Sequence, residues 1–161
     1  MSISEDDVKA LSIKSYKVGS AEVKFNNLPF CTNHTIAARK EMCVKMRVAY
    51  PNGVGVVLHL AAEPLRQLGK HLKNADKPYA RVVVQKDVQM SELVMHARSM
   101  FSKDLPSVAG IFLYLCDGDV ERIVSLQAPF KEYMERAMKD DGLCHFVVTV
   151  EAVFGGEGGR R

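Results

Sequence analysis

The sequence lacks the long apolar run that a membrane-spanning helix needs. No stretch of about 18 apolar residues is present. The acidic start, residues 4–7, also lacks the basic and apolar regions of a secretion signal. We therefore expect a cytoplasmic protein that reaches a membrane only through a covalent attachment.

The chain also lacks a strong charge of one sign and any pairing of cysteines. Its 22 Lys and Arg residues against 19 Asp and Glu give a net charge of +3, too weak and too evenly spread to indicate nucleic acid as the main partner. In a reducing compartment, unpaired cysteines usually behave as buried hydrophobic residues, so we expect no disulfides. The four cysteines are Cys31, Cys43, Cys116 and Cys144.

No motif for catalysis, metal binding or a cofactor stands out. Cys31 and His34 have a spacing that suits two zinc ligands, but no second pair completes a tetrahedral site. Cys144 and His145 are neighbours on a predicted strand and would point to opposite faces, which excludes a cysteine–histidine nucleophile there. With no phosphate loop or Ser-His-Asp set either, we predict a protein that is not an enzyme and needs no cofactor.

The length and composition are those of one globular domain with loose ends. The chain has 161 residues, of which 47% are hydrophobic. Residues 1–27 show no sustained period and are predicted to form a flexible arm. Residues 28–150 are predicted to form the domain, with an insertion at about residues 61–80. Residues 151–161 are rich in glycine and are predicted to form a flexible tail.

The first half of the domain allows two interpretations. Apolar and polar residues alternate over residues 44–50, which is the period of a half-buried strand. Asn52-Gly53 then supplies a turn, and the apolar residues 54–60 fit a returning strand, so we prefer a hairpin. The competing interpretation is a helix over residues 37–49, because several residues share one helical face: Ala38, Met42, Cys43, Met46 and Ala49.

The second half alternates strands and helices. Strands are predicted at residues 81–85, 110–115 and 143–150, and a short helix at residues 63–73 within the insertion. The main amphipathic helix follows from apolar residues at helical spacing: Met90, Leu93, Val94, Ala97 and Phe101. A second helix begins at Pro129. These elements predict an α+β fold in which the main helix lies across one face of a sheet.

This order resembles the ubiquitin-like β-grasp, with a mixed four-stranded sheet, a main helix on one face and an N-terminal extension. The second half is similar to the autophagy ubiquitin-like modifiers, whose chains end in an aromatic residue followed by Gly. The resemblance rests on residues 81–84, 88–93 and 111–115, and on Arg98, Tyr133, Asp141-Gly142, Leu143 and Phe154-Gly155.

The resemblance implies that Gly155 is the conjugation residue. A cysteine protease would cut the Gly155–Gly156 bond, and activating and conjugating enzymes would then carry the freed carboxylate to an amine. Phe154 would contact these enzymes. Gly156 and Gly159 are possible alternative ends of the mature chain.

Two branches of the family differ in the amine that they modify. Members like autophagy-related protein twelve are attached to a lysine of a partner protein, and the predicted strand at residues 44–50 favours this branch. Members like autophagy-related protein eight are attached to phosphatidylethanolamine, and residues 50–52 and 28–30 resemble their Tyr-Pro-Asp and His-Pro-Phe. The preferred interpretation is the first branch, with a role in autophagosome formation and recruitment to autophagosomal membranes. The alternatives are the second branch and a β-grasp protein-binding module that is not conjugated.

The resemblance also implies a groove for aromatic-x-x-aliphatic peptides, which would add to the second family strand by β-augmentation. Gly55 and Gln85 stand where the family usually has prolines, and His96 lies near the second pocket. The implied partner-binding positions in the domain are Met46, Gly55, Val57, Arg81, Val83, Leu93 and Leu143.

Overall fold

The computed structural model describes residues 15–18, 21–61, 77–102, 105, 110–116 and 123–150. The predicted tail at residues 151–161 and the predicted short helix at residues 63–73 lie outside the described residues. The description below concerns the rest.

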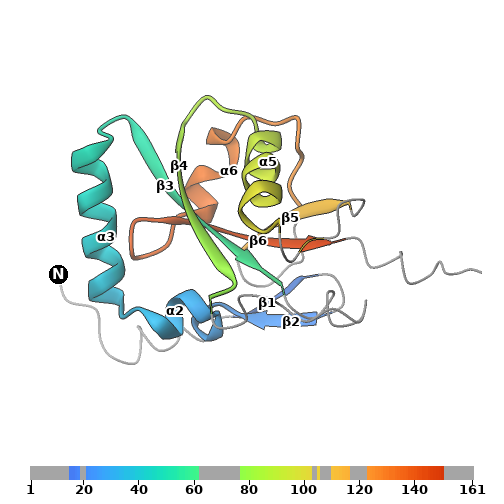
Figure 1. The fold of residues 1–161 in the computed structure, drawn as a ribbon, viewed down its shortest axis with the longest axis horizontal. Helices are drawn as coiled ribbons and strands as arrows, with labels where there is room; N and C mark the ends of the chain where they lie inside the picture. Colours follow the sequence, from blue (N-terminus) through green and yellow to red (C-terminus); the bar gives the residue numbers. More distant parts are fainter. Residues whose placement is uncertain are drawn as a thin grey trace, which may run out of the picture.

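A mixed four-stranded sheet forms the centre of the fold (Figure 1), and this part of the predicted fold class is confirmed. The strands follow the order β4-β3-β6-β5. Strands β3 and β6 are parallel, with Val56 opposite Cys144, whereas β4 and β5 run antiparallel to their neighbours. The strands are β3 (Gly53–Leu60), β4 (Tyr79–Gln85), β5 (Ile111–Leu115) and β6 (Cys144–Val150).

Two helices cover one face of this sheet, and they enclose the main hydrophobic core. The predicted helical face is confirmed, because Met90, Leu93, Ala97 and Phe101 are all buried there. The second predicted helix is also present, with Ala137 buried and Met134 and Met138 packed against the core. The two helices are α5 (Met90–Met100) and α6 (Lys131–Ala137).

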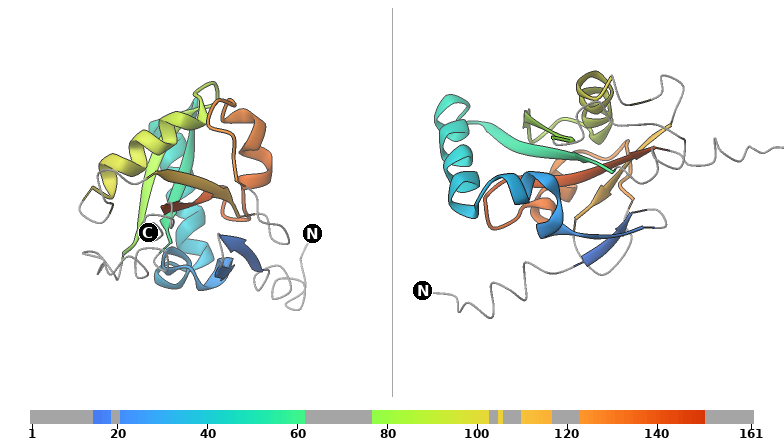
Figure 2. Two further views of the ribbon diagram at one scale, coloured as in Figure 1. Left: turned by 90° about the vertical axis from the view of Figure 1, so that its right-hand side faces the viewer. Right: turned by 60° about the horizontal axis from the view of Figure 1, so that its bottom comes forward.

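Further helices cover the opposite face, so the sheet lies between two helical layers (Figure 2). A smaller cluster of buried side chains joins this second layer to the sheet. Phe30 and Cys43 come from the helices, Val57 comes from β3, and Leu143 directly precedes β6. The elements of the layer are the short 3₁₀ helix η1 (Phe25–Asn27), α2 (Pro29–Asn33) and α3 (Ile36–Ala49).

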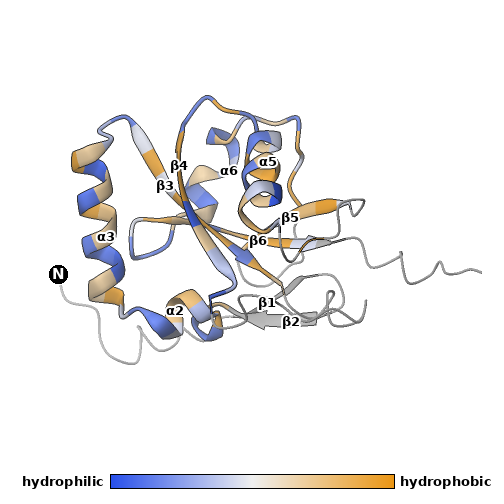
Figure 3. Ribbon diagram, viewed as in Figure 1, coloured by the Kyte–Doolittle hydropathy of each residue, from blue (hydrophilic) through white to orange (hydrophobic). Residues whose placement is uncertain are grey.

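The predicted strand at residues 44–50 is wrong, because this segment belongs to α3. The Thr35 hydroxyl caps the helix by accepting a hydrogen bond from the Ala38 amide at 3.1 Å. Val44 and Val48, whose alternation indicated a strand, are 60% and 78% exposed on the outside of the helix. Figure 3 shows this mixed hydropathy along α3. The turn at Asn52-Gly53 therefore joins a helix to β3.

The predicted hairpin is wrong for the same reason, since the antiparallel partner of β3 comes later in the chain. Strand β4 pairs with β3 along its whole length, with Val54 opposite Val84 and Val57 opposite Arg81. About twenty residues of chain separate the two strands. The alternation of apolar and polar residues along one segment does not show which distant segment pairs with it.

Residues before the domain also contain regular structure that their irregular pattern did not indicate. Strands β1 (Ser15–Val18) and β2 (Ala21–Lys24) pair antiparallel. Phe25 follows them and is buried against Cys116 and Val147. Residues 15–27 thus lead directly into the second helical layer.

Candidate functional site

Strand β4 is an edge of the sheet, and among the described residues it pairs only with β3. Its side chains alternate, with Val82 and Val84 buried in the main core and Arg81 and Val83 exposed on the side of α3. An edge strand presents unpaired backbone groups to which an extended peptide can add. The exposed side chains then decide which peptides fit.

A first cavity lies beside this edge, between α3 and β4, and we call it the first groove cavity. Its volume is about 270 Å³. Gly55 is essential to its shape, because a Cβ there would lie 2.7 Å from both Leu143 Cδ2 and Met46 Cε. The main lining residues are Met42, Met46, Gly55, Arg81, Val83 and Leu143. The cavity is thus mostly apolar, with the Arg81 cation at its rim.

A second groove cavity lies between β4, α5 and the turn after α3, and has a volume of about 620 Å³. Its lining includes the exposed apolar side chains of Tyr50, Val83 and Met100. His96 of α5 lines it as well. Two cavities side by side along one open strand form a groove that suits a peptide with two apolar anchors.

The structure brings together most of the groove residues named from the sequence but not all of them. Met46, Gly55, Arg81, Val83 and Leu143 line the first groove cavity. Val57 and Leu93 do not line either groove cavity, because both are fully buried on opposite faces of the sheet. Val57 lies under α2 and α3, and Leu93 lies on the inner side of α5 in the main core. Phe154, Gly155 and Gly156 lie outside the described residues.

Sequence reasoning missed Met42 and Tyr50 as parts of this groove. Met42 lies one helical turn before Met46, so the helical face noted for residues 37–49 would have identified it. Tyr50 ends α3 and reaches the second groove cavity together with Pro51 and Asn52. The preference for a strand at residues 44–50 concealed both contributions.

A chain of buried hydrogen bonds lies behind the groove, on the α3 face of the sheet. Arg39 Nη1 donates to Asp141 Oδ2 at 3.0 Å, and His145 Nε2 lies 2.9 Å from the same oxygen. His59 Nε2 lies 2.9 Å from His145 Nδ1. The Leu143 amide donates to Asp141 Oδ1 at 2.9 Å. We call Arg39, Asp141, His145 and His59 the buried polar network.

The partners fix the tautomers of the two histidines. Asp141 can only accept, so His145 Nε2–H donates to it, and Nδ1 of the neutral ring is an acceptor. His59 Nε2–H then donates to this Nδ1. His59 Nδ1 remains as an acceptor, and it has no hydrogen-bond partner among the described residues. The network therefore holds one charge pair, Arg39 with Asp141, and two neutral rings.

Burial dominates the ionisation of the two rings. It lowers the pKa of His59 well below 6.5, and the neighbouring His145 and Arg39 lower it further. Burial also lowers the pKa of His145, although the Asp141 carboxylate opposes this shift. Burial opposes the charge of Asp141, but its hydrogen bonds with His145, Leu143 and Arg39 prevail and the pKa of this carboxyl lies below 3.8. Both histidines are neutral at pH 7.

This arrangement supports packing rather than chemistry. The chain of groups ends at His59, which is only 1% exposed. Cys144 packs in the core on the other face of the sheet, as the strand geometry predicted, and burial raises the pKa of its thiol to about 12. A protonated thiol is a poor nucleophile. Among the described residues, no group of three or more His, Cys, Asp or Glu side chains is placed to hold a metal ion.

The comparison with solved structures supports the fold, whereas the other two comparisons with known proteins found no match. No family model matches the chain, and no curated protein matches it. Among the solved structures that match is the crystal structure of Trypanosoma brucei ATG8, with a TM-score of 0.58 and 16% sequence identity. The match covers 76% of this chain and 93% of the trypanosomal chain. Within the described residues, no helix is long and apolar enough to cross a membrane. The chain has the predicted α+β, ubiquitin-like β-grasp fold.

Proposed function

We propose that this chain is an autophagy ubiquitin-like modifier, cut after Gly155 and conjugated through that residue to phosphatidylethanolamine. The observation that carries the proposal is the layer of helices α2 and α3, which precede the four-stranded sheet in the chain. The branch of protein twelve was preferred because a strand was predicted at residues 44–50. That reason no longer holds, because this segment is part of α3. The similarity of the fold to a protein named ATG8 supports the lipid-conjugated branch.

The end of the sheet suits this role. Strand β6 ends at Val150, five residues before Gly155. Five extended residues span at most about 17 Å, which is enough to carry Gly155 away from the sheet and into an enzyme channel. Gly155 has no side chain to obstruct such a channel.

In this proposal the chain performs no chemistry of its own. A cysteine protease removes the residues after Gly155, and the new carboxylate is adenylated by an activating enzyme. It then passes as a thioester to a conjugating enzyme and is captured by the amine of the lipid. The chain supplies the carboxylate and the docking surfaces, remains cytoplasmic until it is conjugated, and is then held on autophagosomal membranes.

The test compares two truncated chains in cells of the source organism. A chain that ends at Gly155 bypasses the protease and is expected to form a covalent adduct, whereas a chain that ends at Phe154 is not. Phospholipase D should release phosphatidic acid from a lipid adduct, leaving only ethanolamine on Gly155, and leave a protein adduct intact. A protein-sized adduct that resists the lipase would favour the branch of protein twelve, and equal behaviour of both chains would refute conjugation through Gly155.

The groove predicts a defined effect on peptide binding. Val83 lines both groove cavities and is 37% exposed, so Val83→Glu places a charge where an apolar anchor docks. We expect the affinity for an aromatic-x-x-aliphatic peptide to fall at least tenfold, about 1.4 kcal/mol, as measured by fluorescence polarisation. The matched control is Val48→Glu on the outer surface of α3, which should bind like the unmodified chain. Equal affinities of the two variants would contradict a groove at β4.

A further inference from the structure

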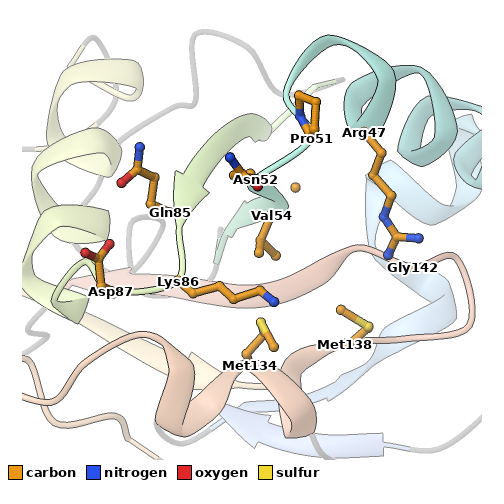
Figure 4. Close-up of a pocket in the computed structure, with 12 residues that line it drawn as sticks. Arg47, Pro51, Asn52, Val54, Gln85, Lys86, Asp87, Met134, Met138 and Gly142 are labelled. Carbon is orange, nitrogen blue, oxygen red and sulfur yellow. The ribbon is translucent and has the colours of Figure 1, made fainter.

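A third cavity, separate from the edge groove, lies at the end of the sheet where β3 begins and β4 ends (Figure 4). We call it the end cavity. It has a volume of about 590 Å³, within the range of ligand sites. The turn after α3, the turn after β4 and the segment around α6 enclose it, and its lining includes Arg47, Val54, Lys86, Met134, Met138 and Gly142.

Two cations reach this cavity from different elements. Figure 4 shows Lys86 extending from the turn after β4 across the cavity, and Arg47 reaching it from the C-terminal end of α3. Arg47 Nη2 would lie 3.7 Å from a Cβ placed on Gly142, whose φ of +83° already favours glycine. Neither Arg47 nor Lys86 has an ion-pair partner in the described part of the chain. Two exposed, unpaired cations that converge on one cavity suit an anion.

The floor of the cavity is apolar and adaptable. Met134 and Met138 lie one turn apart at α6 and face the cavity below Lys86 (Figure 4). Methionine side chains adjust to apolar groups of different shapes. An occupant with a negative group next to an aliphatic side chain would therefore match both the cations and the floor.

The remaining lining residues favour a peptide over a nucleotide or a phosphorylated ligand. Asn52 and Gln85 present carboxamides, which can donate to and accept from a peptide backbone. None of the described residues that line the cavity is aromatic, so a base would find no stacking partner among them. Asp87 reduces the net charge of the lining to +1 and disfavours a multiply charged phosphate.

We propose that the end cavity binds an acidic segment of a partner protein, with a carboxylate held between Lys86 and Arg47 and a neighbouring aliphatic side chain packed on Met134 and Met138. This site adjoins the edge groove, since Pro51, Asn52, Gly53 and Gln85 border both it and the second groove cavity, but its two cations and two methionines line only the end cavity. It does not depend on conjugation, because it is complete in the described residues.

The test uses a random dodecapeptide phage library, selected on the purified full chain and on the double variant Lys86→Glu with Arg47→Glu. Selection on the unmodified chain should enrich peptides with an acidic residue beside an aliphatic one, and selection on the double variant should not. A synthetic peptide of that consensus should bind the double variant at least tenfold more weakly. Its affinity for the double variant Lys40→Glu with Lys45→Glu, an equal charge change on α3 away from the cavity lining, should be unchanged.

Three results would overturn the proposal. The first is the same consensus on both chains, and the second is no acidic consensus on either. The third is that the charge reversals reduce sedimentation with phosphatidylserine vesicles while no acidic peptide is selected, which would assign the cations to a membrane surface. Circular dichroism establishes that each variant is folded, and Val83→Glu, which disrupts the edge groove, should retain the acidic consensus.

Discussion

Asp141→Ala is expected to lower the free energy of unfolding by about 3–5 kcal/mol, the range found when one partner of a buried ion pair is removed. Asp141 is 1% exposed and accepts hydrogen bonds from Arg39, His145 and the Leu143 amide. Alanine would leave the Arg39 guanidinium, itself only 7% exposed, without its carboxylate. The buried donors of His145 and Leu143 would also lose their acceptor.

The neighbouring residue provides the control for this substitution. Asp140 is exposed, and Asp140→Ala removes the same charge one position earlier. Surface substitutions of this kind usually change stability by no more than about 0.5 kcal/mol. Urea unfolding of both variants measures the difference. Similar losses in the two variants would show that the buried polar network does not stabilise the fold.

Acidification from pH 7.5 to pH 5.5 is expected to destabilise the chain by roughly 1 kcal/mol through His59 alone. Its pKa in the folded chain lies well below 6.5, so the unfolded chain takes up a proton in this range and the folded chain does not. Stability is therefore complete above about pH 6.5 and is lost as the pH falls below it. The lowered pKa of His145 adds a loss of the same sign.

The groups around the two rings explain why neither ring gains a proton easily. The positive charges of Arg39 and Lys139 oppose protonation of the histidine rings, whereas the Asp141 carboxylate favours protonation of His145. The pKa of Asp141 lies below 3.8, so this carboxylate does not titrate between pH 7.5 and 5.5.

His59→Gln isolates the contribution of that ring. The glutamine amide can still donate to His145 Nδ1 but does not titrate. Urea unfolding of both chains at the two pH values should show a pH-dependent loss roughly 1 kcal/mol smaller in His59→Gln. An equal loss in both chains would mean that His59 takes up a proton in the folded chain as readily as in the unfolded chain.

The sequence predicted those helices and strands in which the spacing of apolar residues matches the side chains that the element itself buries. The face of α5 was evident because Met90, Leu93 and Ala97 contact the sheet at every turn of the helix. Segments around β3, β5 and β6 were recognisable as short apolar runs between turn residues. These signals arise from neighbours in the chain, and the order of elements then indicated the β-grasp.

The error at residues 44–50 came from a helix with little apolar burial. Only Arg39 and Cys43 of α3 are fully buried, and the valines on its outer surface happen to alternate with polar residues. The helix is fixed instead by the Thr35 cap and by packing against β3 and Leu143, which follow later in the chain. A strand pattern on a solvent-facing helix is misleading for this reason.

The candidate site was predictable only in part, because the packing of α2 and α3 decides which residues on that face of the sheet stay accessible in the groove and which are buried. Gly55, Arg81 and Val83, three of the predicted positions, line one cavity because the register of β3 and β4 brings them together. Val57 would face the groove if α2 did not place Phe30 over it. The buried polar network joins residues about one hundred positions apart, Arg39 and Asp141, and no local pattern reveals such a pair.

Intact-mass spectrometry of the tagged protein recovered from its own cells tests the central claim most directly. The account predicts a processed chain that ends at Gly155 and a second species heavier by one phosphatidylethanolamine, both absent from Gly155→Ala. A chain that still ends at Arg161, with no adduct in either sample, would contradict conjugation and leave a β-grasp protein that acts only by binding.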